Sequence, residues 1–177
     1  MHYGCISMED EMINISLSKV TKNEKDIFYN LNQLFAYDFS ELNKMDINDD
    51  GLYQPLQDVD EYYTKDNYNS FLIKVEGKLA GLVVIKFIDE EGINYLRHFF
   101  IMRKYRRLKI GERTANMIFD MFPGKWRVFQ FDYNEPAICF WRKIIERCTQ
   151  GNYMETRRID DRGIKQEFFS KEYERIQ

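Results

Sequence analysis

The chain has 177 residues, of which 44% are hydrophobic and 16% aromatic, and its net charge is −3. This length suits one domain with a substantial core, so we expect a single domain over residues 1–177, with residues 1–11 loosely ordered or disordered. The slightly negative charge gives no general attraction to nucleic acid or to an anionic membrane. Neither a secretory signal nor an apolar run long enough to cross a bilayer is present, so we expect a cytoplasmic protein.

The three cysteines do not point to a special site. Cys5, Cys139 and Cys148 lie in unrelated contexts, and their spacing matches neither a disulfide framework nor a zinc site. We therefore expect reduced thiols and no bound metal.

The first part of the chain predicts a strand, a helix and an irregular segment. Residues 12–20 alternate between apolar and polar side chains, which is typical of a strand. Thr21 and Glu24 form a capping box that opens a helix. Residues 37–69 have weak periodicity and many acidic side chains, which indicates short helices and a loop. In the helix, the residues expected in the core are Ile27, Leu31, Leu34 and Phe35.

The second part predicts alternating strands and helices. Residues 71–75 and 79–88 form a hairpin around a glycine turn, and residues 93–102 form a third strand. The remaining elements are expected as a helix at 111–122, a strand at 126–131, a helix that opens at 134–136, and strands at 153–159 and 164–169. The buried stripes expected in the two helices are Ile110, Met117, Ile118 and Met121, then Ile138, Trp141, Ile144 and Ile145.

A basic turn at residues 103–109 joins the strand at 93–102 to the helix that follows. The first N–H groups of a helix have no partner within the helix and lie at the positive end of its dipole, so such a unit presents an anion site. Arginines around it make a phosphate the expected ligand. Two strands joined through a helix should lie parallel, and ligands of such sheets bind at the carboxyl ends of the strands, where this turn lies. The alternative is a solvated basic loop.

The sequence RRLKIG at 106–111 resembles the central motif of the GNAT superfamily of N-acetyltransferases, which is Arg or Gln, two residues, Gly, one residue, then Gly or Ala. Arg106 and Gly111 match, whereas Lys109 replaces the first glycine. Downstream, Asn134 and the aromatic pair Phe140-Trp141 resemble the second motif of the family, in which a tyrosine often occupies the position of Trp141. The similarity is closest to a bacterial group of predicted acetyltransferases.

This resemblance implies an α/β (α+β) fold, with a mixed, mostly antiparallel central sheet flanked by helices and splayed parallel fourth and fifth strands. It implies acetyl coenzyme A as cosubstrate and transfer of the acetyl group to a primary amine on a small molecule or a protein. Backbone N–H groups of the turn would hold the pyrophosphate, and pantetheine would pair with the fourth strand. The cofactor-binding residues so implied are Phe100, Ile101, Met102, Arg103, Arg106, Arg107, Leu108, Lys109, Ile110, Gly111, Glu112, Asn134 and Trp141.

Direct attack by an amine needs a base for the ammonium, a donor for the leaving thiolate, and stabilisation of the carbonyl oxygen. The N–H of Ile101 is implied for the last role. His98 is the candidate base because its ordinary pKa is near neutral, with Asp132 as a poorer one. Strand neighbours alternate faces, so His98 and Ile101 point to opposite sides, and a base role requires a water relay or a bulge. Trp141 cannot give up a proton, which leaves Tyr133 or water as the donor.

Two other functions stay open at this point. One is a GNAT-like module that binds acyl coenzyme A without efficient catalysis and serves regulation or protein interaction; the other is a protein-interaction domain that does not bind coenzyme A. The acidic stretch at 38–61, if it lines the acceptor cleft, favours a cationic acceptor such as a polyamine, an aminoglycoside or a lysine side chain. The sequence leaves open the acceptor, the acyl preference and whether the protein forms a homodimer.

Overall fold

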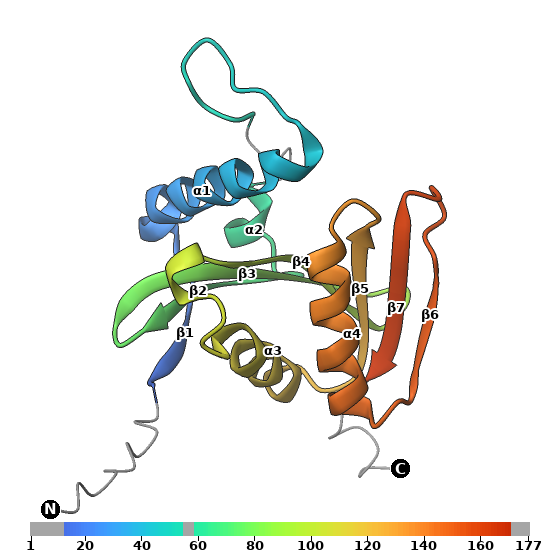
Figure 1. The fold of residues 1–177 in the computed structure, drawn as a ribbon. Helices are drawn as coiled ribbons and strands as arrows, with labels where there is room; N and C mark the ends of the chain where they lie inside the picture. Colours follow the sequence, from blue (N-terminus) through green and yellow to red (C-terminus); the bar gives the residue numbers. More distant parts are fainter. Residues whose placement is uncertain (1–12, 55–58, 171–177) are drawn as a thin grey trace, which may run out of the picture.

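The structure is a computed structural model that describes residues 13–54 and 59–170, so the expectation for residues 1–11 lies outside the described residues (Figure 1). A seven-stranded sheet runs through the molecule in the order β1-β2-β3-β4-β5-β7-β6. Every neighbouring pair is antiparallel except β4 and β5, which are parallel. The strands are β1 (Ile15–Lys19), β2 (Tyr68–Val75), β3 (Lys78–Ile88), β4 (Ile93–Ile101), β5 (Lys125–Phe131), β6 (Tyr153–Arg157) and β7 (Gly163–Phe169).

The helices cover both faces of this sheet. They are α1 (Lys25–Asn43), α2 (Glu61–Thr64), α3 (Ile110–Met121) and α4 (Glu135–Thr149). Figure 1 shows α1 and α2 on one side of the sheet and α3 on the other, with α4 beside β5. Each side has its own apolar cluster, one against α3 and α4 and one against α1 and α2. This is the mixed, mostly antiparallel, helix-flanked sheet that the sequence predicts. Among the described residues, no helix is both long and apolar enough to cross a membrane.

The parallel strands β4 and β5 pair over only part of their length. Their ladder runs from Ile93 opposite Lys125 to Leu96 opposite Val128. Both strands continue beyond this point, β4 as far as residue 101 and β5 as far as residue 131, without pairing with each other. The predicted splay of the fourth and fifth strands is therefore confirmed.

A β-bulge in β4 lies just past the end of that ladder. The register with β3 shifts between the pairs Val84–His98 and Ile85–Leu96, so Arg97 is an extra residue in β4. Arg97 and His98 consequently face the same side of the sheet, where both interact with Tyr62 of α2.

The inward face of α1 differs from the predicted one. Ile27 and Leu34, which we expected in the core, are 39% and 46% exposed, whereas Phe28 and Asn32 are buried. The Phe28 ring makes an edge-on contact with Tyr62 of α2, at 6.3 Å between centroids. The helix is thus turned by about one residue from the expected orientation, and this places a polar side chain against the sheet.

The stripe predicted for α3 is only partly right, whereas that of α4 is confirmed. In α3, Met121 is 46% exposed and Met117 is only partly buried, while Phe119 is buried and packs edge-on against Trp126. In α4, all four predicted residues are buried: Ile138, Trp141, Ile144 and Ile145.

The orientation of α1 can be tested with two neighbouring residues. Phe28→Ala should lower the free energy of unfolding by about 3–5 kcal/mol, because it opens a cavity beneath a fully buried ring. Ile27→Ala, the matched control one position away, should change it by about 1 kcal/mol or less. Urea unfolding of both variants measures the difference. A larger loss for Ile27→Ala than for Phe28→Ala would mean that the helix is oriented as the sequence alone predicts.

Candidate active site

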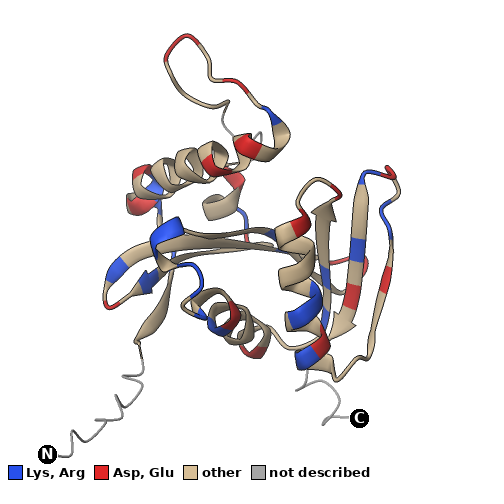
Figure 2. Ribbon diagram, in the orientation of Figure 1, with Lys and Arg blue, Asp and Glu red and all other residues tan. Residues whose placement is uncertain are grey.

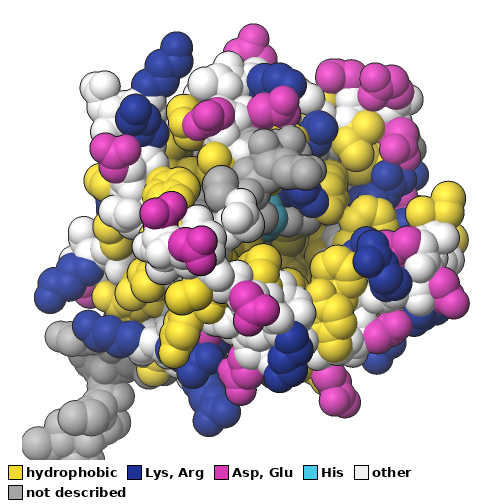
Figure 3. Space-filling view, turned by 90° about the horizontal axis from the view of Figure 1, so that it is seen from above, with side chains coloured by type: hydrophobic (Ala, Val, Ile, Leu, Met, Phe, Trp, Pro, Cys, Tyr) yellow, Lys and Arg dark blue, Asp and Glu magenta, His cyan; other side chains and the backbone are white. Residues whose placement is uncertain are grey.

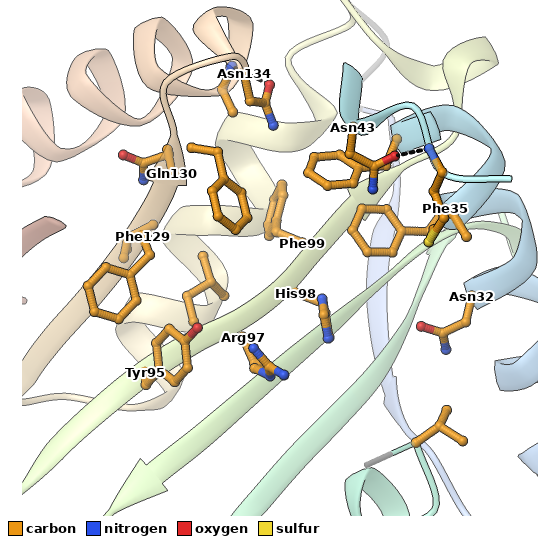
Figure 4. Close-up of a pocket in the computed structure, with 18 of the residues that line it drawn as sticks. Asn32, Phe35, Asn43, Tyr95, Arg97, His98, Phe99, Phe129, Gln130 and Asn134 are labelled. Carbon is orange, nitrogen blue, oxygen red and sulfur yellow. Dashed lines mark hydrogen bonds between the residues drawn. The ribbon is translucent and has the colours of Figure 1, made fainter. Parts of the chain in front are cut away.

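The separation of β4 and β5 opens a cavity of about 550 Å³. Residues from α1, β4, β5 and the start of α4 line it, and Figure 4 shows Asn32 and Phe35 of α1 facing His98 and Phe99 of β4 across it. Viewed from the α1 side, hydrophobic side chains surround a hollow in the surface (Figure 3). The cavity therefore reaches from this surface to the gap between the two strands.

Backbone groups of β4 point into this gap. The N–H of Met102 donates to the carbonyl of Ala80 in β3, at 2.8 Å. Because hydrogen-bonding directions alternate along an antiparallel pair, the N–H groups of Phe99 and Ile101 are directed away from β3, toward the side of β5. No strand of the described residues pairs with β4 there, since the β4–β5 ladder ends at Leu96. An extended chain with amide groups can take the place of the missing strand.

The turn after β4 presents a second set of backbone donors. Within the described residues, no oxygen accepts a hydrogen bond from the backbone N–H groups of residues 107–112. Arg107 and Lys109 have left-handed backbone conformations, with φ of 63° and 57°. Their side chains are exposed, and Figure 2 shows basic residues along this turn between β4 and α3. Free N–H groups at a helix N-terminus beside two cations form an anion site.

The structure shows a different reason why glycine suits each of the two glycine positions of the motif. Lys109 stands where the motif has its first glycine, and its left-handed φ is the conformation that glycine adopts at least cost. At Gly111, a Cβ would lie 3.2 Å from the ring of Phe140 in α4, which is tighter than ordinary contact. The loop thus has a left-handed backbone at the position of the first glycine, which a lysine occupies here.

The other two arginines of the turn are held by carboxylates of α1. Arg103 donates to Asp38 at 2.6 Å and to Glu41 at 3.1 Å, and Arg106 pairs with Asp38 and donates to the carbonyl of Ile101 at 2.9 Å. Burial would raise the pKa of Asp38, but the hydrogen bonds from Arg106 and Arg103 outweigh it and lower the pKa. These arginines fix α1 to the end of β4, while Arg107 and Lys109 keep their charges available.

His98 lies partly exposed in the cavity wall. Its Nε2 shares a hydrogen bond of 3.0 Å with the hydroxyl of Tyr62, and its ring contacts Phe35 edge-on. Loss of hydration, with the charge of Arg97 adding to it, lowers the pKa of His98 to about 3. The imidazole is therefore neutral at pH 7 and a weak base. It faces α1 and α2, whereas Ile101 packs on the α3 side, so the predicted opposition of the two residues is found and the bulge, which precedes both, does not remove it.

Trp141 and Asn134 lie where α4 meets the gap. Trp141 is 5% exposed and packs edge-on against Phe99, with centroids 5.0 Å apart, so it closes the α4 side of the cavity. Asn134 lines the cavity and caps α4, because its side chain accepts from the N–H of Ala137 at 3.3 Å.

Tyr133 and Asp132 lie near the cavity without lining it. The ring of Tyr133 stacks on Phe131, a lining residue, at 5.1 Å between centroids. Burial raises the pKa of Tyr133 despite the opposing charges of Arg158 and Arg162, so its phenol keeps a proton at pH 7. Asp132 is paired with Arg157 at 2.7 Å, and hydrogen bonding from this arginine lowers its pKa.

Comparison with known proteins agrees with this geometry. Residues 32–145 match the model of the Acetyltransferase (GNAT) family. The chain belongs to the GNAT acetyltransferase family. No curated protein sequence matches it.

Solved structures of this family share the fold. A GNAT-family acetyltransferase from Staphylococcus aureus is 18% identical with a TM-score of 0.60, covering 86% of this chain and 98% of its own. An acetyltransferase from Thermus thermophilus is 13% identical with a TM-score of 0.65, covering 88% and 96%. The aminoglycoside acetyltransferase AAC(6')-Ib, in complex with coenzyme A, is 10% identical with a TM-score of 0.64, covering 92% and 98%. At these identities, the likeness supports the fold alone.

Several residues of the cavity were missed by reasoning from the sequence. Arg97, Asn32 and Gln130 line it, and the side-chain oxygen of Asn32 and both polar atoms of the Gln130 amide have no hydrogen-bond partner among the described residues. The adjacent pair Arg97-His98, a cation and a titratable group within a largely apolar strand, was the one available signal. Among the described residues, no group of three or more His, Cys, Asp or Glu side chains gathers as metal ligands would.

The lowered pKa of His98 predicts acid sensitivity. A histidine whose pKa is about 3 when folded and about 6.5 when unfolded binds protons preferentially in the unfolded state, so its contribution is present above pH 6.5 and lost as the pH falls toward 3. The free energy of unfolding should drop by about 2 kcal/mol between pH 7 and pH 5 from this group alone. His98→Gln keeps a polar partner for Tyr62 without the titration. Urea unfolding at both pH values should show a smaller drop in the variant; equal drops would contradict the shift.

Proposed function

We propose that the protein is a cytoplasmic, acetyl-CoA-dependent N-acetyltransferase that acts by direct attack of a primary amine, on a small molecule or a protein, at the acetyl thioester. The observation that carries this proposal is the gap between β4 and β5, with unpaired backbone donors along β4 and at the start of α3 and a cavity behind them. Family membership supports the same reaction class.

The residues present fit coenzyme A at both ends of this gap. The free N–H groups of residues 107–112 and the charges of Arg107 and Lys109 suit a pyrophosphate. The edge of β4 from Phe99 to Ile101 suits the two amides of pantetheine, because its N–H groups face a side with no strand. Acetyl-CoA, when bound, supplies an acetyl group activated as a thioester.

In the proposed reaction, the amine nitrogen uses its lone pair to form a bond to the acetyl carbon, the carbon–sulfur bond breaks, and the electron pair leaves on sulfur. The N–H of Ile101, at the end of β4, would donate to the carbonyl oxygen as negative charge develops there. The amine must lose one proton, and the thiolate gains one. The amide product and free coenzyme A balance the step.

Two side chains near the cavity are candidates for the two proton transfers. Tyr133 carries its proton at pH 7 and is the candidate donor, since Trp141 has no acidic proton. His98 is the candidate base, although its low pKa makes transfer from an ammonium uphill. Water in the cavity is the alternative for both transfers.

A second candidate function is a module that binds acyl coenzyme A with little catalysis. Two observations favour it: the indole of Trp141 occupies the position of the family's frequent tyrosine, and the pKa of His98 is far below neutral. Both functions require coenzyme A binding, so turnover of amines separates them.

The cofactor site can be tested by removing its two free charges while preserving the backbone. Arg107→Asn with Lys109→Asn should weaken acetyl-CoA binding about tenfold, because asparagine tolerates a left-handed φ but leaves only the N–H groups for the phosphates. Lys78→Gln, an exposed lysine on the β2–β3 hairpin, is the matched control and should bind as the wild type does. Calorimetric titration measures each dissociation constant.

The result for the wild type decides the proposal itself. Failure of the folded protein to bind acetyl-CoA would refute the proposed function and leave a GNAT fold with an interaction role. Binding that the double variant retains at full strength would keep the function and move the phosphate site elsewhere.

The role of Tyr133 can be isolated by removing one oxygen. Tyr133→Phe keeps the stacking on Phe131 and should lower kcat by about 100-fold if the phenol protonates the thiolate, with the dissociation constant of acetyl-CoA unchanged. Tyr37→Phe, at an exposed tyrosine of α1, is the control. Thiol release during turnover gives the rate. An unchanged kcat would assign the proton to water.

A further inference from the structure

The described residues that line the cavity do not meet the condition under which the acidic stretch would favour a cationic acceptor. Of the described residues that line it, Arg97 and Arg158 are charged, His98 is neutral, and none is an aspartate or glutamate. Asp38, from the acidic stretch, instead pairs with arginines of the turn after β4. The described lining residues thus include two cations and no carboxylate, and a polyamine would meet no opposite charge among them.

Arg158 has its own partners. Its guanidinium pairs with Asp160 at 2.8 Å and lies 4.3 Å from the centroid of the Phe131 ring. Asp160 compensates the charge of the guanidinium, and the Phe131 ring packs against the plane of the guanidinium. Arg158 therefore forms part of the cavity wall.

Arg97 is in a different situation. Within residues 13–54 and 59–170, no carboxylate forms an ion pair with it. Burial would lower its pKa, but interactions with the phenol oxygens of Tyr95 and Tyr62 outweigh burial and raise it, so the guanidinium stays charged. A guanidinium has five donors in one plane, and two phenols leave donors unused. A partly buried cation that has no carboxylate partner among the described residues favours an anion, and carboxylate or phosphate fits its fork.

Asn32 supplies an independent sign of a ligand. Its side chain is 6% exposed, its amide nitrogen donates to the carbonyl of Phe28 at 2.8 Å, and its oxygen has no partner among the described residues. Figure 4 shows this side chain directed from α1 toward His98, with the oxygen on the cavity side. A buried acceptor without a hydrogen bond is costly, so a ligand N–H or O–H at this position would be stabilising.

The rest of the lining is largely aromatic. The rings of Phe35, Phe99 and Phe129 stand around the space between Asn32 and the two strands (Figure 4). These rings suit a ligand whose apolar part lies between an anionic group and an amine.

We propose that the acceptor is an amine that also carries an oxyanion, a carboxylate or a phosphate, which binds Arg97. The apolar part of the acceptor lies among the phenylalanine rings, and its amine faces the gap between β4 and β5. An N–H or O–H group of the acceptor donates a hydrogen bond to the side-chain oxygen of Asn32. This inference rests on the proposed acetyltransferase function and names the acceptor class for the same site. Arg97 is thereby a specificity-determining residue, turned into the cavity by the bulge.

Matched acceptor pairs test the proposal. L-Phenylalanine and L-phenylalaninamide differ in the carboxylate, 2-aminoethyl phosphate and ethanolamine differ in the phosphate, and spermidine is the polycation. In the wild type, kcat/KM for one anionic member should exceed that of its neutral partner at least tenfold, and the pair that shows this identifies the oxyanion. Arg97→Gln should abolish the preference, and Arg97→Lys should retain part of it, while acetyl-CoA binds all three proteins equally.

Several outcomes would overturn the inference without touching the proposed function. Faster turnover of spermidine or of the neutral amines would do so, as would a preference that persists unchanged in Arg97→Gln. Absence of acetyl-CoA binding by the wild type would instead refute the acetyltransferase proposal.

A binding measurement covers the case in which the variants fold poorly or no acceptor turns over. The wild type saturated with coenzyme A is titrated calorimetrically with N-acetyl-L-phenylalanine, its amide, N-acetyl-2-aminoethyl phosphate and N-acetylethanolamine. Tighter binding of an anionic product by tenfold or more supports the oxyanion site. Equal or absent binding within both pairs refutes it.

Discussion

The hydrogen bonds that β4 and β5 do not make beyond Leu96 and Val128 are the constraint on which the rest of the structure depends. Backbone N–H and C=O groups at such a position cost stability unless something pairs with them. On the α4 side, the gap is closed by rings, with Phe99 against Trp141. On the α1 side it stays open as the cavity. A ligand that brings its own amides can complete the sheet, so the weak point of the sheet and the binding site are the same feature.

The carboxylates of α1 explain how this open side keeps its shape. Asp38 lies between Arg103 and Arg106, and Arg106 also holds the last carbonyl of β4. This cluster ties α1 to the mouth of the anion site while leaving the cations at 107 and 109 without carboxylate partners among the described residues. Exposed ion pairs contribute little to stability, so the effect of the cluster is mainly positional. It also holds Asp38 away from the cavity, so the described lining residues include no carboxylate although residues 38–54 contain several.

The order of strands and helices could be predicted because it depends on local pattern, whereas the mostly antiparallel sheet with splayed strands was implied by the resemblance to the GNAT superfamily. The alternation in β1, the apolar stripe of α4 and the strand–turn–helix around Gly111 each specify their own structure, and the order of elements specifies the parallel pair.

The face of α1 could not be predicted in the same way. Ile27 and Phe28 are both large and apolar, and contact with α2, far along the chain, decides between them.

The bulge in β4 was not predictable for a related reason. Strict alternation would place Arg97 and His98 on opposite faces, and a single inserted position in the ladder places them together. The charge of the cavity follows from this bulge and from the partners of Asp38, and both depend on pairings between segments distant in sequence, which local periodicity does not contain.

The bulge that places Arg97 beside His98 also affects how readily His98 can accept a proton. Arg97 lowers the pKa of His98, and an oxyanion bound to Arg97 would offset that effect, so acceptor binding would make His98 more basic. Loss of hydration is the larger cause, however, and a ligand that fills the cavity removes more water from the imidazole. The two effects of the ligand on the pKa of His98 therefore oppose each other. In the proposed reaction, water on the open side of the cavity would then be the alternative acceptor of the amine proton, and Arg97 and His98 would orient the acceptor.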